Sequence, residues 1–271
     1  MFYKDILEEL LKKEKNPVNS MYLHEIGLKW KNFEKAAAEK KGSNENLVNA
    51  LNNFIKAISN RKFKFNAVSQ KGFKEDSDLF ANYYLNDLIS ILMNRRKIIS
   101  HLGIKWGFQA FNTNVKFNPV SLSSFEKDLN FERSSSPQLL QLTQELDFQF
   151  RVSGKRSFKK YKTVFPLIVF HTFTNLSEAN FIHTEYYANM AKTTFEKSKT
   201  IIVTETLEDG FSPDIKSSRI DSICVLRKQY ISENKNAITQ DAVDALELKI
   251  KQLLTEENGV LGDFAKTGII T

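Results

Sequence analysis

The stretch "FPLIVFHTFTNLSEANF", residues 165–181, decides the fold. It belongs to a mostly apolar run from Thr163 to Phe173, a pattern that predicts a strand buried on both faces. Ser177 then fits the N-cap of a helix. The expected inner face of this helix consists of Phe181, Thr184, Ala188, Ala191 and Phe195. The β-branched run "TIIVTET", residues 200–206, predicts a second strand parallel to the first. The stretch therefore opens a strand–helix–strand unit.

The segments on either side of this unit extend the sheet. Phe148, Phe150 and Val152 alternate with polar residues, which predicts a half-buried strand that forms an antiparallel hairpin with 163–173. Residues 221–227, "DSICVLR", predict a further strand. A last helix carries Val243, Leu246, Ile250 and Leu253. The predicted fold is α/β (α+β), with a mixed β-sheet flanked by helices.

The N-terminal region has helical periodicity. Three stripes indicate helices: Phe2, Ile6, Leu7, Leu10 and Leu11; Leu47, Leu51, Phe54, Ile55 and Ile58; and a third that starts after Ser77, runs through Leu79, Phe80, Tyr83, Leu88, Ile91 and Leu92 and points towards Gly103. The run Ser134-Ser135-Ser136-Pro137 is the clearest turn or linker in the chain. We therefore expect a mainly helical recognition or interaction region at 1–136 and a sheet-containing core with a C-terminal helix at 137–271.

Composition limits the class of protein. The chain has 271 residues, of which 41% are hydrophobic and 26% charged, as in a globular protein. One cysteine, Cys224, excludes an internal disulfide and a cysteine-based zinc site. The central apolar run is too short to cross a bilayer, and the first residues lack a secretory signal pattern, so the expected location is the cytoplasm, with no membrane partner. The net charge of +7 and the pI near 9.2 favour a polyanion as partner.

The order of elements and the segments "IIVTE" and "SRIDSICVLRKQ" resemble the core of the PD-(D/E)xK nucleases, the fold of many type II restriction endonucleases. The resemblance covers roughly residues 140–230. It implies a Mg²⁺-dependent phosphodiester hydrolase, in which carboxylates from neighbouring strands hold the metal and a Lys stabilises the transition state.

At two of the three positions of the family pattern, this sequence holds a different type of residue. Asp147 corresponds to the first Asp and is the expected metal ligand. His171 stands at the Glu position and Phe173 at the Lys position, and neither supplies a hard oxygen ligand or a charged amine. We expect Asp147 and His171 to share one rim of the sheet.

Three interpretations remain open at this point. The chain has kept the fold and a DNA-binding surface but lost the metal chemistry. Alternatively, a Mg²⁺ site has been rebuilt from Asp147, Glu178 and Glu185, with Lys155 or Lys160 in place of the lost Lys. In the third interpretation the unit is an ordinary strand–helix–strand unrelated to nucleases.

Two basic segments are candidates for DNA contact. The run "SGKRSFKKYK" predicts a basic hairpin suited to phosphates, and "NRRKII" adds two adjacent arginines. Their basic residues are Lys155, Arg156, Lys159, Lys160 and Lys162 in the first and Arg95, Arg96 and Lys97 in the second.

The functional expectation combines these features. The chain is expected to bind duplex DNA as the recognition or degenerate subunit of a restriction or phage-defence system, alone as a homodimer or with a second nuclease subunit. An active Mg²⁺-dependent endonuclease with a rebuilt site is the first alternative, and a non-enzymatic helical scaffold is the second. Salt-dependent duplex binding separates the scaffold from the other two.

Overall fold

The computed structural model describes residues 2–39, 43–58, 77–95, 104–107, 139–151, 158–194, 196, 198–231 and 236–267. For the first two strands and for residues 158–167 the description is limited to the backbone. The helices are α1 (Phe2–Lys13), α2 (Pro17–Ala38), α3 (Asn44–Ile58), α5 (Ser77–Arg95), α7 (Glu178–Thr194) and α8 (Gln240–Thr267). The strands are β1 (Ile104–Gly107), β2 (Leu139–Arg151), β3 (Phe158–Leu176), β4 (Lys199–Leu207) and β5 (Ser222–Val225).

The described strands form one mixed sheet in the order β1-β2-β3-β4-β5. The β1/β2 and β2/β3 pairs are antiparallel, whereas β3/β4 and β4/β5 are parallel. This confirms the predicted hairpin, the strand–helix–strand unit and the mixed sheet. The β2/β3 register shifts beside Leu142 and Thr143, opposite Pro166. A proline has no N–H for the ladder and is tolerated inside a sheet at such irregular points.

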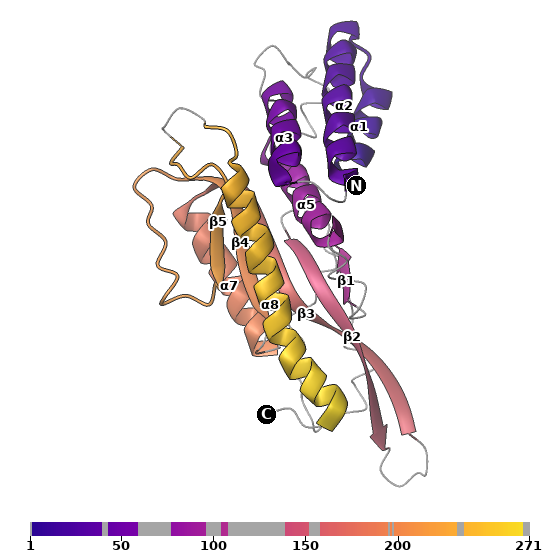
Figure 1. Ribbon diagram of the computed structural model, residues 1–271, viewed down its shortest axis with the longest axis vertical. Helices are drawn as coiled ribbons and strands as arrows, with labels where there is room; N and C mark the ends of the chain where they lie inside the picture. The colour runs from indigo at the N-terminus through magenta and orange to yellow at the C-terminus, as the bar shows by residue number, and fades with distance from the viewer. Residues whose placement is uncertain are drawn as a thin grey trace.

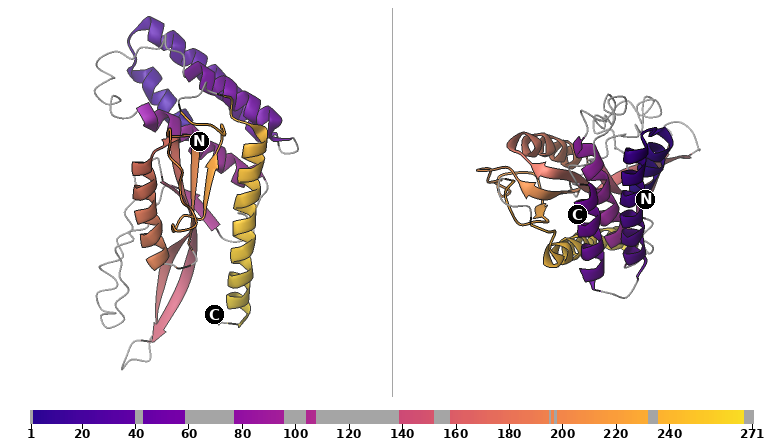
Figure 2. Two further views of the ribbon diagram at one scale, coloured as in Figure 1. Left: turned by 90° about the vertical axis from the view of Figure 1, so that its left-hand side faces the viewer. Right: turned by 90° about the horizontal axis from the view of Figure 1, so that it is seen from above.

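The helices cover the two faces of the sheet unequally. In Figures 1 and 2, α7 lies on one face, α8 lies on the other, and α1, α2 and α3 gather at one end beyond α5. The β2–β3 hairpin extends at the opposite end of the molecule (Figure 1). None of the helices among the described residues combines the length and the hydropathy that a bilayer-spanning segment needs.

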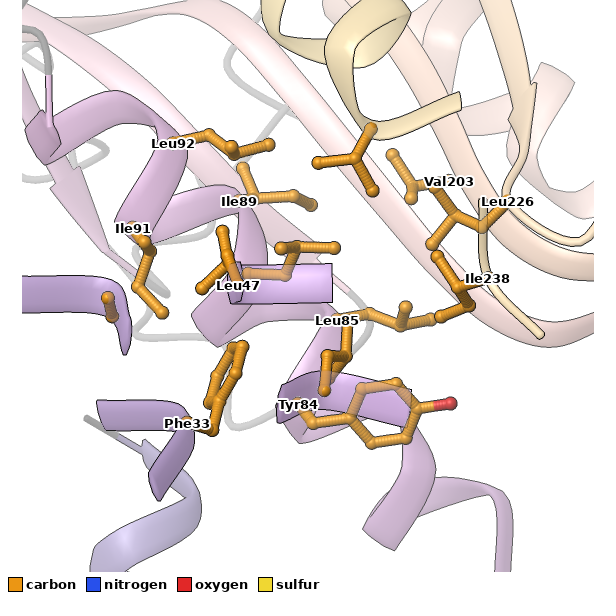
Figure 3. Close-up of a cluster of buried hydrophobic side chains, with 14 of the residues drawn as sticks. Phe33, Leu47, Tyr84, Leu85, Ile89, Ile91, Leu92, Val203, Leu226 and Ile238 are labelled. Carbon is orange, nitrogen blue, oxygen red and sulfur yellow. The ribbon is translucent and has the colours of Figure 1, made fainter. Parts of the chain in front are cut away.

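A single large core joins the N-terminal helices to the sheet. The second half of α5, from Tyr84 to Met93, is buried on all sides, which is the behaviour of a central helix. Figure 3 shows Leu85 and Ile89 of α5 in one cluster of buried side chains with Leu47 of α3 and the sheet residue Val203. Each fully buried aliphatic side chain of this kind stabilises the fold by roughly 1.5–3 kcal/mol. Helices and sheet therefore share their core, and the boundary expected at 136–137 lies outside the described residues.

Alternation along β3 and β4 divides the sheet residues between the two faces. Ile168 and Phe170 pack into the large core, while Phe173 packs into a smaller cluster beneath α7. On the large-core side, the hydroxyl of Thr172 donates to Oδ1 of Asn86 in α5 at 3.3 Å. Residue 171 therefore faces α7 together with residue 173, because side chains two apart in a strand share a face.

The helix predicted after Ser177 is confirmed. The backbone N–H of Asn180 donates to Oγ of Ser177 at 3.2 Å, which is the hydrogen bond of an N-cap. Four of the five residues expected on its inner face are buried, namely Phe181, Thr184, Ala188 and Ala191. Phe195 lies outside the described residues.

Candidate functional site

The candidate site is the pair of positions in β3, His171 and Phe173, that we align with the Glu and Lys of the nuclease pattern. His171 is paired with Leu139 of β2 on one side and with Ile202 of β4 on the other. Residues 171 and 173 lie well before the end of β3 at Leu176, and α7 covers this face of the strand. Both positions therefore lie inside a packed layer between strand and helix.

His171 is almost fully buried, with 3% of its surface exposed, and its Nε2 has no hydrogen-bond partner within the described structure. The ring lies 6.1 Å from the ring of Tyr187 in α7, and that ring lies 4.8 Å from the ring of His183. Burial, with a smaller contribution from the nearby His183, lowers the pKa of His171 to about 3. The imidazole is therefore neutral at physiological pH, and a neutral imidazole is a poor ligand for Mg²⁺.

Phe173 is a core residue. It is 5% exposed and belongs to the cluster formed with Leu176, Phe181 and Ile202, among others. A phenyl ring in this cluster cannot supply the charge or the hydrogen bond that the family's Lys gives to an attacking water. Neither of the two altered positions can therefore perform the family's chemistry.

The expectation that Asp147 and His171 share one rim of the sheet is wrong. Asp147 is paired with Lys162, whereas His171 is paired with Leu139, eight positions earlier in β2. Eight residues of strand span about 26 Å at the usual rise per residue. The sequence prediction failed because the hairpin register, in which Arg151 is paired with Phe158, places Asp147 opposite Lys162, nine positions before His171 in β3. A metal-binding role for Asp147 itself remains an untested prediction.

The proposed rebuilt site is not assembled either. Glu178 begins α7 just beyond the end of β3, and Leu176 lies fourteen positions after Lys162, the partner of Asp147. That separation is about 46 Å along an extended strand. Glu185 lies two turns further into α7 and is partly exposed. Within the described residues, no group of three or more histidine, cysteine or acidic side chains is placed to hold a metal ion. Lys155 lies outside them.

The basic segments lie at two places in the fold. Lys159, Lys160 and Lys162 fall in the first part of β3, where Arg151 is paired with Phe158 and closes the described part of the hairpin. This arrangement matches the predicted extended hairpin (Figure 1). Arg95 is the last residue of α5. Lys155 and Arg156, together with Arg96 and Lys97, lie outside the described residues.

Glu205, at the end of the segment "IIVTE", has a structural role. Its Oε2 accepts a hydrogen bond from Nε of Arg227 at 2.5 Å, and both side chains are buried. Sequence reasoning did not identify Arg227, since the two residues are 22 positions apart and meet only through the parallel pairing of β4 and β5. A buried, paired carboxylate is engaged within the fold and is not presented to a substrate.

Comparison with solved structures identifies the class of fold. A solved structure of the native BbvCI A2B2 tetramer contains a chain that matches with a TM-score of 0.53 and 15% sequence identity, covering 93% of this chain and 95% of that one. BbvCI is a type II restriction enzyme. The chain has a restriction-endonuclease-like fold. The likeness extends well beyond residues 140–230 and includes the helical N-terminal region. No protein-family model and no curated protein matches the sequence.

Proposed function

We propose that this chain binds duplex DNA as the recognition subunit of a restriction or phage-defence system, and that a partner subunit cuts the DNA. The observation that carries the proposal is a restriction-endonuclease-like fold in which the two residues that we align with the catalytic Glu and Lys, His171 and Phe173, are buried. Both are buried beneath α7, so the positions that would carry the chemistry contribute to packing instead.

Charge supports DNA as the ligand. The chain carries a net charge of +7, and lysines are concentrated in the hairpin strand β3 at 159, 160 and 162. Lysines on an extended hairpin can reach phosphates along a groove, and each neutralised phosphate releases bound counterions. The hairpin, together with Arg95 at the end of α5 and Arg96, which follows it in the sequence, is therefore assigned to phosphate and base contact.

The residues at the two altered positions do not fit Mg²⁺. This ion takes hard oxygen ligands in near-octahedral geometry, while the positions offer an uncharged imidazole and a phenyl ring. No catalytic step is assigned to a metal there. An asymmetric DNA site has two different half-sites, which require two different protein surfaces. Two different subunits, of which the second cuts the DNA, would meet this requirement. The matching solved structure is itself described as an A2B2 tetramer.

A binding measurement tests DNA recognition. Fluorescence anisotropy of a labelled duplex is recorded with the full chain across a series of salt concentrations. We expect the logarithm of the binding constant to fall linearly with the logarithm of the salt concentration, because counterion release drives the association. Binding that is the same at low and moderate salt would instead support the scaffold alternative.

A cleavage assay tests the division of labour. Supercoiled plasmid is incubated with the isolated chain in Mg²⁺, in Mn²⁺ and in EDTA, and we expect no nicking in any of them. Metal-dependent cleavage that is lost in Asp147→Ala would overturn the proposal and favour a rebuilt site around Asp147.

A further inference from the structure

Beyond the body of the sheet, β2 and β3 continue as a two-stranded ribbon. β1 is paired with β2 only at residues 141–144, and β4 is paired with β3 only from Ile168 onward. Among the described strands, residues 145–151 of β2 and 158–164 of β3 are therefore paired only with each other. Figure 1 shows this part of the hairpin projecting beyond the rest of the sheet.

The register divides the ribbon residues between two faces. The pairing runs without a shift from Glu145 to Arg151, and directly paired residues share a face while neighbours along a strand alternate. One face, which we call the polar ribbon face, has Val164 and Phe158 at its two ends and six residues of hydrogen-bonding type. These six are Glu145, Asp147, Gln149 and Arg151 of β2 and Lys160 and Lys162 of β3.

The opposite face of the ribbon differs in kind. Its residues are Leu146, Phe148 and Phe150 of β2 and Lys159, Tyr161 and Thr163 of β3, most of them apolar or aromatic. Base edges are recognised mainly by hydrogen bonds, which such residues supply poorly. The polar ribbon face is therefore the side of the hairpin whose chemistry suits sequence recognition.

Charge changes along the polar ribbon face. Its two acidic residues lie at the end next to the sheet, where Asp147 is paired with the oppositely charged Lys162. Towards the turn, Gln149 is paired with Lys160, and Arg151 follows. Of the described residues on this face, those in the half near the turn carry two positive charges and no negative charge. This half can approach phosphates without repulsion.

The dimensions of the ribbon select the groove. Two paired strands lie about 4.8 Å apart before their side chains are counted, so a two-stranded ribbon fits the major groove, about 12 Å wide, and exceeds the minor groove, about 6 Å wide. Gln149 and Arg151 are two residues apart, about 7 Å along the strand. This spacing is twice the rise of about 3.4 Å per base pair. The two residues can therefore contact separate base pairs.

We infer that Gln149 and Arg151 read base edges in the major groove of duplex DNA, while Lys160 and Lys162 hold phosphates beside them. The division follows from side-chain type. A glutamine amide pairs with adenine and a guanidinium with guanine through two hydrogen bonds each, whereas a lysine ammonium is a compact point charge. The inference rests on the proposed function, because it assigns sequence recognition by the same DNA-binding hairpin to two residues.

Selection from a library of duplexes with a randomised central segment tests the assignment. The full chain and each variant select from the same library, and anisotropy then gives affinities for the selected sequence and for its single base-pair changes. For the wild type we expect the two base pairs read by Gln149 and Arg151 to discriminate on the order of 5- to 150-fold. Arg151→Ala is expected to lose discrimination at one base pair and Gln149→Ala at another.

Matched variants separate base contact from charge. Lys160→Ala and Arg151→Ala each remove one positive charge from the same face, but Lys160→Ala is expected to weaken binding to all sequences alike and to lower the salt slope by about 0.9. Arg219→Ala and Gln252→Ala, at exposed positions after β4 and on α8, are expected to change neither affinity nor preference. Far-UV circular dichroism verifies that each variant is folded.

A change of preference gives a test that does not depend on lost binding. Gln149→Glu keeps the size of the side chain and replaces its amide by an acceptor, so the preferred base is expected to change from adenine to cytosine. Substitution of 7-deazaguanine for guanine removes an acceptor from the major groove only. It is expected to weaken binding of the wild type at the base pair read by Arg151 and to have no further effect on Arg151→Ala.

The outcomes separate this inference from the proposed function. A wild type that binds no duplex overturns both. If the wild type binds with salt-dependent affinity but selects no sequence, or if Gln149→Ala and Arg151→Ala keep the full preference, DNA binding stands and this inference is overturned. Uniformly weaker binding by both variants, with preference retained, would make the polar ribbon face a phosphate-binding surface and overturn the inference as well.

Discussion

The guanidinium of Arg227 and the carboxylate of Glu205 form a buried ion pair between the segment after β5 and the strand β4, with Nε 2.5 Å from Oε2. The backbone N–H of Arg227 also donates to the carbonyl of Glu205 at 3.0 Å. Through Nη1, Arg227 donates in addition to the backbone carbonyl of Asn236, shortly before α8. The pair therefore connects the end of β4 to the segment after β5 and to the approach to α8.

Replacing Arg227 by Met is expected to lower the free energy of unfolding by about 3–5 kcal/mol, because it leaves a buried carboxylate without its guanidinium. Urea unfolding measures the loss. The control is Lys228→Met at the next position, whose ion pair with Asp241 is exposed and should contribute little to stability. Similar losses for the two variants would mean that burial does not set the strength of the pair.

His171 is expected to make stability depend on pH. Its pKa is about 3 in the folded chain and near 6.5 in the unfolded chain, so between these values only the unfolded state binds the proton. Stability is therefore fully present above pH 6.5 and falls as the pH falls. The expected loss between pH 7 and pH 5 is about 2 kcal/mol, given 1.36 kcal/mol per unit.

The variant His171→Phe is expected to remove this loss, since it keeps a ring in the cavity and cannot be protonated. The measurement is urea unfolding at pH 7 and pH 5. His24→Gln serves as control, because His24 is an exposed histidine on α2. If His171→Phe retains the wild-type difference between the two pH values, His171 is not the titrating group.

Local features of the fold were predictable from the sequence, and register was not. The apolar run 163–173, the Ser177 cap and the inner face of α7 depend on residues close together in the chain, and the structure confirms them. The start of β2 was missed, because Leu139, Leu142 and Leu146 also have the spacing of a helix stripe. The register of the β2–β3 hairpin, in which Arg151 pairs with Phe158, puts Asp147 opposite Lys162 and so separates it from His171.

Other features depend on contacts that no local pattern contains. Within the predicted helical region, no apolar stripe was found for α2. Its exposed side also carries apolar residues, namely Val18, Met21 and Leu28, so the helical spacing of the buried residues does not stand out in the sequence. Its start was nevertheless encoded in "NP", since Asn16 caps the helix and Pro17 occupies its first turn. The ion pair between Glu205 and Arg227 requires the order of the parallel strands, which propensity and spacing do not specify.

Introducing a Lys at position 173, which we align with the Lys of the nuclease pattern, is expected to damage the fold. Phe173→Lys places an ammonium group in the cluster beneath α7, and the loss of stability should exceed about 3 kcal/mol. Val18→Lys, at an exposed apolar position of α2, should change stability by less than about 0.5 kcal/mol. Denaturant midpoints compare the two. An equally small effect at 173 would show that the position is accessible to solvent and that the motif is less altered than its burial indicates.

The hairpin lysines provide the most direct test of DNA contact. Each phosphate contact contributes about 0.9 to the slope of the logarithm of the binding constant against the logarithm of salt. Replacing Lys159, Lys160 and Lys162 by Ala is therefore expected to reduce that slope by about 2–3 and to weaken binding without changing sequence preference. The control replaces Lys12, Lys31 and Lys35 on α1 and α2, at the other end of the molecule (Figure 1). Both triple variants remove the same net charge, so an equal reduction would assign the salt dependence to overall charge and not to the hairpin.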